Sequence, residues 1–416
     1  MIDHGEYTGP SSVNRITTQL SEVADGVAVI ESFSHVVAFR TGDGLVLFDT
    51  SLETLAPACL DSLRGWSDDP VRAIVYTHGH RDHAAGCRTF LDEADARGDR
   101  RPEVVGHEKV AERFERYELT DGYNAVINER QFGGGPSGRG TTGPGGGFFD
   151  DWVRPDRDYE DELTLTVGDT AFDLHHGKGE TDDHTWTWIP EHRAVCAGDF
   201  FIWVFPNAGN PQKAQRFPRE WVQALRAMAD KGGELFLPAH GLPIAGRERI
   251  QRVLHDVADV LEALVLEVLD RMNVGESLDT IVHEVRVPSE ALDRPWMQPV
   301  YDEPEFVVRN IWRLYGGWYD GNPARLKPPS DATLAAEVAG LAGGVDVLVA
   351  RAGELASAGD LRLAAQVAEW AVGAAPDDRR AHGVRADVYT ARRREEASLM
   401  AKGIFGAAAR ASDPDT

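Results

Sequence analysis

The pattern of hydrophobic and polar positions over the first 240 residues predicts alternating strands and helices. Two apolar-rich strands are expected within 27–49, on either side of a Thr-Gly-Asp-Gly turn at 41–44. Further strands are predicted over 72–76, 103–105, 163–176, 185–197 and 234–238, and helices over 55–66, 108–117 and 219–231, with another beginning at Ala84. Because helix and strand alternate, the predicted fold class is α/β, with α+β as the alternative.

The pattern changes after Gly246. Strand signals stop there, and apolar residues recur at spacings of three and four through 250–272 and again through 334–409, which is typical of packed helices. Residues 133–147 are rich in glycine and are expected to form a flexible surface loop. We therefore predict an α/β domain over 1–246 and an all-helical domain over 247–416.

Composition narrows the class of protein. The chain has 416 residues, 68 acidic and 43 basic side chains, and a net charge of −25, which argues against nucleic-acid binding. At 42% hydrophobic residues it can bury a sizeable core, and no uncharged stretch approaches the ~20 residues of a membrane span. Three cysteines without CxxC spacing and an N-terminus without an apolar signal segment favour a reducing compartment. We expect a cytoplasmic protein.

The strongest chemical signal follows the strand predicted over 72–76. His78, His80, Asp82 and His83 form an HxHxDH pattern in a turn, where the backbone can aim four metal-binding side chains inward. This pattern predicts a dinuclear metal site, in which the first two histidines bind one ion and Asp82 and His83 bind the other.

The motif resembles that of the metallo-β-lactamase superfamily, whose fold is an αββα sandwich with the metals at one end of the sheets. The resemblance implies that Asp199, in Ala-Gly-Asp, bridges the two metals and that His240, in Pro-Ala-His-Gly, completes the second metal site. Glu180 stands where most of the superfamily has a histidine, and alkylsulfatases of the same superfamily carry a glutamate there. The implied metal ligands are His78, His80, Asp82, His83, Glu180, Asp199 and His240.

Two histidines compete with Glu180 for the ligand position. His184 lies four residues past Glu180, so that both share one face of an extended strand, and His176 precedes it. Imidazole binds zinc as readily as carboxylate does. We rank Glu180 first and His184 second, with His184 also a candidate substrate contact.

A second block of the chain is similar to alkylsulfatases. Residues 306–323, which read FVVRNIWRLYGGWYDGNP, resemble the opening of their helical dimerisation domain, which implies a homodimer. We expect Trp296, Trp312 and Trp318 to be buried in this half, either within one chain or between chains. The chain departs from that family at Asp199-Phe200, where alkylsulfatases usually carry Glu-Asn. It also ends soon after the helices, without their C-terminal sterol-carrier-like domain, which argues against a detergent-type substrate.

These residues imply a hydrolase with two zinc ions, with iron and manganese as alternatives. We expect a bridging hydroxide, with Asp82 and Asp199 as catalytic residues, to cleave a small sulfate ester. A carboxylic ester, lactone or phosphodiester is the alternative substrate, and a diiron redox protein is a third hypothesis. Because the metal site would be near neutral, an anionic substrate needs separate contacts, and the candidates are Asn124, Arg130, Lys178, Lys213 and Arg216, each of which has a surface or turn role as its alternative.

Overall fold

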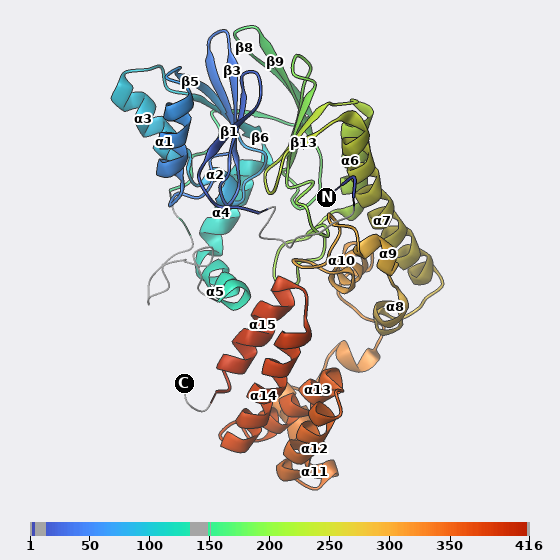
Figure 1. The fold of residues 1–416 in the computed structure, drawn as a ribbon. Helices are drawn as coiled ribbons and strands as arrows, with labels where there is room; N and C mark the ends of the chain where they lie inside the picture. Colours follow the sequence, from blue (N-terminus) through green and yellow to red (C-terminus); the bar gives the residue numbers. More distant parts are fainter. Residues whose placement is uncertain (1, 5–13, 134–148, 150, 414–416) are drawn as a thin grey trace. The chain divides into compact units, whose positions relative to one another are not determined.

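The computed structural model describes residues 2–4, 14–133, 149 and 151–413. The chain forms two compact units (Figure 1). The first unit comprises Met1–Asp121 and Phe148–Gly317, and the second comprises Gly122–Gly147 and Trp318–Thr416. By packing, the first unit therefore extends past residue 246, where we predict a domain boundary from sequence.

The first unit contains two β-sheets. The seven-stranded sheet has the order β1-β2-β3-β4-β5-β6-β7, antiparallel from β1 to β4 and parallel from β4 to β7. The six-stranded sheet has the order β13-β12-β11-β10-β9-β8, in which β11 and β12 pair in parallel and the other neighbours pair antiparallel. The strands of the first sheet are β1 (Leu20–Ala24), β2 (Val27–Ile30), β3 (Val36–Thr41), β4 (Gly44–Phe48), β5 (Val71–Val75), β6 (Glu103–His107) and β7 (Arg157–Tyr159). Those of the second are β8 (Glu162–Val167), β9 (Thr170–His176), β10 (Thr185–Ile189), β11 (Ala194–Gly198), β12 (Leu235–Pro238) and β13 (Ile244–Ala245).

The two sheets face each other across an apolar core and carry helices on their outer faces. Phe39 and Phe48 of the first sheet pack with Phe172 of the second. The sheets bury their other faces against helices, so many of their strands are apolar on both faces. A second core joins the first sheet to α1, α3 and α4, and a third joins the second sheet to α6, α7, α8 and α10. The first unit is therefore the expected αββα sandwich. Its helices are α1 (Ala56–Trp66), α2 (Arg81–Ala84), α3 (Cys87–Arg97), α4 (Lys109–Leu119), α6 (Pro218–Asp230), α7 (Arg247–Asn273), α8 (Leu278–Glu284), α9 (Ser289–Leu292) and α10 (Pro304–Gly316).

Four strands end at the edge where the predicted metal ligands follow. The parallel pairs β4–β5 and β11–β12 each bring two carboxyl ends together, and the next residues of the chain include Asp49, His78, Asp199 and His240. Parallel pairing therefore gathers side chains that lie far apart in the sequence.

The elements differ from the sequence prediction in several respects. The runs predicted over 163–176 and 185–197 are two strands each, β8 with β9 and β10 with β11, and the helix over 121–132 is absent from the prediction. Strands β1, β7 and β13 are absent from the prediction, because β7 and β13 span only three and two residues and β1 is partly exposed. Residues 27–48 form three strands instead of two. The helix predicted to begin at Ala84 is two helices, α2 and α3, which are separated by Gly86, where a Cβ atom would lie 2.1 Å from the Thr50 carbonyl oxygen. The glycine-rich loop predicted over 133–147 lies, beyond residue 133, outside the described residues.

The second unit is helical. A core of alanine, leucine and valine side chains joins α11, α12, α13 and α14. Helix α5, which begins at the unit boundary, packs on α15 so closely that a Cβ atom at Gly403 would lie 1.8 Å from the Gln131 carbonyl oxygen. The second unit is therefore built from two separate segments of the chain. The helices are α5 (Asp121–Phe132), α11 (Asp331–Ala342), α12 (Val345–Ser357), α13 (Leu361–Ala374), α14 (Arg379–Glu395) and α15 (Leu399–Arg410), with the 3-10 turn η2 (Pro323–Arg325) before them.

The three tryptophans expected in the helical half differ in burial. Trp296 is 4% exposed, and Trp312 is partly buried against the same core, so both pack within the first unit. Trp318 is 71% exposed. Among the described residues no single helix is long and apolar enough to cross a membrane, and α11 with α12 reaches that length only across an 88° bend.

Candidate metal centre

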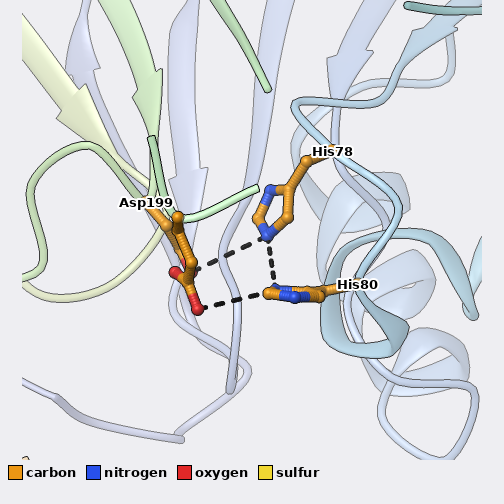
Figure 2. Close-up of side chains that lie close together, drawn as sticks. His78, His80 and Asp199 are labelled. Carbon is orange, nitrogen blue, oxygen red and sulfur yellow. Dashed lines mark hydrogen bonds and ion pairs between the residues drawn. The ribbon is translucent and has the colours of Figure 1, made fainter. Parts of the chain in front are cut away.

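One cluster of metal-binding donors contains two histidines of the turn after β5. His78 Nε2 lies 2.7 Å from His80 Nδ1, and both side chains point toward Asp199 from the opposite sheet (Figure 2). His80 Nδ1 also lies 3.8 Å from Glu180 Oε1. The donor atoms of His78, His80, Glu180 and Asp199 all lie within 4.8 Å of one another. Burial lowers the pKa of both histidines well below the usual range, which keeps them in the neutral form that binds metals.

The second cluster adjoins the first and contains Asp82, His83 and His240, whose donor atoms also lie within 4.8 Å of one another. Asp199 faces both clusters, since its Oδ2 lies 3.9 Å from His78 Nε2 and 3.5 Å from His83 Nε2. Its Oδ1 lies 3.4 Å from His240 Nε2. The position of Asp199 is therefore the one expected of a bridging ligand.

A buried network orients His83. Asp49 accepts hydrogen bonds from the Thr77 amide at 2.7 Å and the Thr77 hydroxyl at 2.8 Å, and its Oδ2 lies 2.7 Å from His83 Nδ1. Because Asp49 has no proton to donate when ionised, Nδ1 of His83 is the donor and Nε2 is free to bind a metal. The sequence pattern places Asp49 at the end of a strand, and the structure gives it this supporting role.

A second network fixes the turn between His78 and His80. Arg113 of α4 donates from Nε to Asp183 Oδ1 at 2.8 Å, and Asp183 Oδ2 accepts the Gly79 amide at 2.8 Å. Burial alone would raise the pKa of Asp183, but the Arg113 guanidinium lowers it to about 2. Gly79 has little room for a side chain, because a Cβ atom would lie 3.0 Å from the Asp183 carboxylate.

Glu180 is held by two residues of the loop that follows β11. Asn207 Nδ2 donates to Glu180 Oε1, and Arg216 donates from Nη2 to the same oxygen at 3.1 Å and from Nη1 to the Glu180 carbonyl. Burial raises the pKa of Glu180, and the nearby carboxylate of Asp199 raises it further, whereas Arg216 opposes both. This buried carboxylate therefore requires a cation beside it.

The structure separates Glu180 from its two histidine rivals. His184 is buried against Phe200, with 4.2 Å between ring centroids, and its Nε2 accepts the Asp199 amide at 3.1 Å. It therefore supports the backbone of Asp199 and has no atom in either donor cluster. His176 stacks on His107 at 3.8 Å, and its Nδ1 donates to the His184 carbonyl. Of the three, only Glu180 joins a cluster among the described residues.

Two family models match the chain. The metallo-beta-lactamase superfamily matches residues 29–240, which is just over half of the chain and includes all seven donors. The chain belongs to the metallo-beta-lactamase superfamily. A second model, alkyl sulfatase dimerisation, matches residues 277–413, and this superfamily member therefore combines the sandwich with a helical dimerisation region.

Several curated proteins are similar to this superfamily member. A linear primary-alkylsulfatase of Pseudomonas sp. is 25% identical over 359 residues, which are 83% of this chain and 67% of the relative. An (R)-specific secondary-alkylsulfatase of Pseudomonas sp. is 28% identical over 377 residues, covering 85% of this chain and 56% of the relative. The chain thus spans from about half to two thirds of the length of these relatives.

A solved structure supports the fold across both units. The stereoselective inverting sec-alkylsulfatase Pisa1 from Pseudomonas sp. matches with a TM-score of 0.83 and 22% identity, covering 95% of this chain and 66% of that one. At this identity the match establishes the fold alone.

The donors fit divalent metal ions, as the superfamily implies. His83 Nε2 and Asp199 Oδ1 are buried and have no hydrogen-bond partner within the described part of the chain. Asp82, Glu180 and Asp199 bring three carboxylates into one buried region with four imidazoles. Neutral imidazole and ionised carboxylate are the ligands that zinc and other divalent metals take in proteins.

The residues expected to bind substrate fall into two groups. Lys178, Lys213, Arg216 and His184 lie in the first unit, where Arg216 is committed to Glu180 and Lys178 lies over the Phe217 ring at 5.5 Å. Burial and the nearby Arg216 lower the pKa of Lys213 to about 8, and the carboxylates of Asp82 and Glu180 oppose that effect. Asn124 and Arg130 lie on α5 in the second unit, whereas the donor clusters lie in the first. Substrate binding by these two residues stays a prediction.

Some supporting residues escape sequence reasoning. Arg113, Asp183 and Asn207 are single polar residues in unrelated segments, and no spacing connects them. His35 is a further residue of this kind. Its amide donates to the Ala239 carbonyl at 2.8 Å and its Nε2 donates to the Gly241 carbonyl at 2.7 Å, so it holds the backbone on either side of His240. The signal available for Asp183 is its place in the acidic run beside Glu180.

Proposed function

We propose that the chain is a metal-dependent hydrolase of sulfate esters, with alkyl sulfates as the substrate class. One observation carries the proposal. Glu180 lies in the first donor cluster where most of the superfamily has a third histidine, and the curated relatives are named alkylsulfatases. The match of the dimerisation model to the helical region supports the same class.

Zinc is the metal that we propose, because the donors are four imidazoles and three carboxylates, and iron and manganese remain the alternatives for such a donor set. Two bound ions would supply Lewis acidity and would lower the pKa of a bridging water toward 7, so that hydroxide is available at neutral pH. Hydrolysis adds water across the ester and releases an alcohol and hydrogen sulfate.

The residues of the chain divide the remaining tasks. Asp199, with its amide held by His184, would hold the two ions at a fixed separation, and Asp82 would hold one of them. Arg216 is engaged with Glu180, so we assign the sulfate oxygens to Lys213, whose charge lies within range of Asp82 and Glu180. With a pKa of about 8, the Lys213 ammonium is mostly protonated at neutral pH.

The decisive experiment measures inorganic sulfate released by the zinc-loaded protein from linear, secondary and aryl sulfate esters. The test variant is Glu180→Ala, and the matched control is Glu162→Ala, which removes an exposed glutamate of β8. We expect release by the wild type and the control, and a loss of kcat of about 100-fold or more for Glu180→Ala, because even the supporting contacts of metal ligands are worth about 10- to 100-fold in activity. Hydrolysis of lactones or carboxylic esters, without sulfate release, would contradict the proposed substrate class.

We further propose a homodimer that works in the cytoplasm. The dimerisation model covers α11, whose Leu334 and Leu341 lie seven residues apart on one face and are 44% and 81% exposed. Such an apolar face is typical of a surface that contacts a partner. All three cysteines are buried and free of disulfides, which supports a reducing compartment.

A further inference from the structure

The loop between β11 and α6 has no regular secondary structure, yet much of it is buried. Every residue from 200 to 210 is buried, including Asn207 and Asn210. A buried loop must find partners for its backbone amides and carbonyls, since water does not reach them. The source of these partners shows what holds the loop in place.

Residues 298–310, which include most of α10, supply several of the partners. The Phe205 amide donates to the Gln298 carbonyl at 3.0 Å, and the Gly209 amide donates to Asp302 Oδ2 at 2.6 Å. At Gly209 the loop touches the helix backbone, because a Cβ atom there would lie 2.2 Å from the Val307 nitrogen. The loop is therefore held against the first turn of α10.

Asn310, about one turn further along α10, binds the end of the loop at two points. Its Nδ2 donates to the Arg216 carbonyl at 3.0 Å, and its Oδ1 accepts the Arg216 amide at 3.3 Å. The same Oδ1 accepts from Gln215 Nε2 at 2.8 Å. Asn310 is 5% exposed, so these bonds form without competition from bulk water. The amide side chain thus pairs with the Arg216 backbone as a strand neighbour would.

Arg216 carries this constraint to the metal centre. Its side chain is 2% exposed, and its guanidinium binds both the carboxylate and the carbonyl of Glu180. A lysine could not make the same two contacts, because the planar guanidinium fixes the direction of each N–H. Glu180 lies near two other carboxylates, Asp82 and Asp199, and Arg216 is a side-chain cation that pairs with it directly.

We propose that helix α10 positions Glu180 through Asn310 and Arg216, and thereby sets the affinity of the first donor cluster for its metal. This inference rests on the proposed metal centre and does not depend on the substrate. Helix α10 lies within the region that matches the alkyl sulfatase dimerisation model. That region therefore has a second role, as part of the structure that supports the metal ligands.

The test measures Zn²⁺ dissociation constants of the full chain by competition with a chromophoric chelator. Asn310→Leu removes both bonds to Arg216, and Arg309→Ala, an exposed neighbour on α10, is the control. We expect Asn310→Leu to weaken one of two zinc equivalents by about 10- to 100-fold, as removal of a ligand's supporting contact does. The control should bind both equivalents as the wild type does.

A double-mutant cycle separates positioning from general support of the fold. If Asn310 acts through Glu180, the effect of Asn310→Leu on zinc affinity should vanish in a Glu180→Gln background. An equal loss in both backgrounds, or unchanged affinity in Asn310→Leu, would overturn the inference. If the leucine variant does not fold, Asn310→Asp replaces it in the test. Aspartate keeps the size and the acceptor of the side chain, but it puts an oxygen where Nδ2 donates to the Arg216 carbonyl, so that bond is lost. Failure of the wild type to bind two ions would contradict the metal centre itself, whatever ester the protein hydrolyses.

Discussion

Asp49 illustrates how a residue outside the two donor clusters can orient one of the candidate metal ligands. It has a φ of 59°, in the left-handed region, and it is 1% exposed. Its carboxylate links the backbone after β5 to His83, the first histidine of the second cluster. A non-glycine residue in this conformation is strained, and strain of this kind persists where the surrounding hydrogen bonds fix it.

Replacement of Asp49 by asparagine should weaken the second metal site. The amide keeps the size of the side chain, but its charge is lost and one of its two polar atoms can no longer accept from Thr77 or His83. We expect zinc at the second cluster to bind about 10- to 100-fold more weakly. Chelator competition would measure this, with Asp43→Asn in the exposed turn before β4 as the control. Unchanged affinity in Asp49→Asn would contradict the role that we assign to Asp49.

At the level of residues, the sequence points to the residues that form the two donor clusters but not to the residues that hold them in place. His78, His80, Asp82 and His83 lie within six positions, so the local pattern points to them, whereas the resemblance to the superfamily implies Glu180, Asp199 and His240. Arg113, Asn207 and Asn310 reach the centre from segments far apart in the chain. Their role depends on three-dimensional packing, which leaves no local spacing or periodicity to read.

Among the elements, α4 has an unexpected connection to the metal-binding turn. Its apolar face packs on the first sheet through Val110 and Phe114, and the intervening Arg113 reaches Asp183 beneath Gly79. The helix therefore contributes both to the core and to the geometry of the two histidines that flank Gly79.

Replacing Arg113 by methionine should destabilise the first unit. The change leaves the Asp183 carboxylate buried without its cation, which costs about 3–5 kcal/mol in the free energy of unfolding. Because the folded pKa of Asp183, about 2, lies below its ordinary value of 3.8, the pair contributes stability above pH 3.8 that is lost as the pH falls toward 2. Denaturant unfolding at several pH values should show that Arg113→Met is less stable than the wild type at neutral pH. Between pH 4 and 2 its free energy of unfolding should fall by less than that of the wild type.

Arg116→Met provides the control for that experiment, since Arg116 is an exposed residue of the same helix. It should unfold within about 0.5 kcal/mol of the wild type. Equal destabilisation by both substitutions would show that the helix, and not the Arg113–Asp183 pair, is responsible.

The short elements mark the limit of prediction from the pattern. Strands β7 and β13 form because neighbouring strands offer them hydrogen bonds, and neither carries an alternation long enough to detect. Helices α1, α4 and α6 and strands β5, β6 and β12 lie close to their predicted ranges, because each buries apolar side chains at the spacing of its element. The division of the region near Ala84 into α2 and α3 depends on contact with Thr50, which the local sequence does not contain.

For the whole molecule, the two units should respond differently to metal removal. All seven donors belong to the first unit, so bound metal stabilises that unit alone. At 100 to 1,000 times the dissociation constant, a ligand adds about 2.7 to 4.1 kcal/mol. Calorimetry with and without a chelator should therefore move one unfolding transition to lower temperature and leave the other unchanged. A single transition that shifts as a whole would show that the units unfold together.

The proposed dimer can be tested on the exposed face of α11. Leu341→Glu places a charge on a side chain that is 81% exposed, within the region of the dimerisation match. We expect it to shift the protein from dimer to monomer in sedimentation velocity. Leu266→Glu on α7, where the leucine is 54% exposed outside that region, should leave the dimer intact. Dimers in both variants would show that this face of α11 does not form the dimer interface.

The packing of α5 on α15 has a consequence for how the protein is made. Helix α5 leaves the ribosome before α15, and residues 133–398 are synthesised between them. At 5–20 residues per second, α5 waits for roughly ten seconds or more before its partner emerges. During this interval its buried face, which includes Ile127, is exposed to chaperones. The helical unit is therefore completed only after α15 has emerged, and a fragment beginning at Trp318 would lack one of its helices.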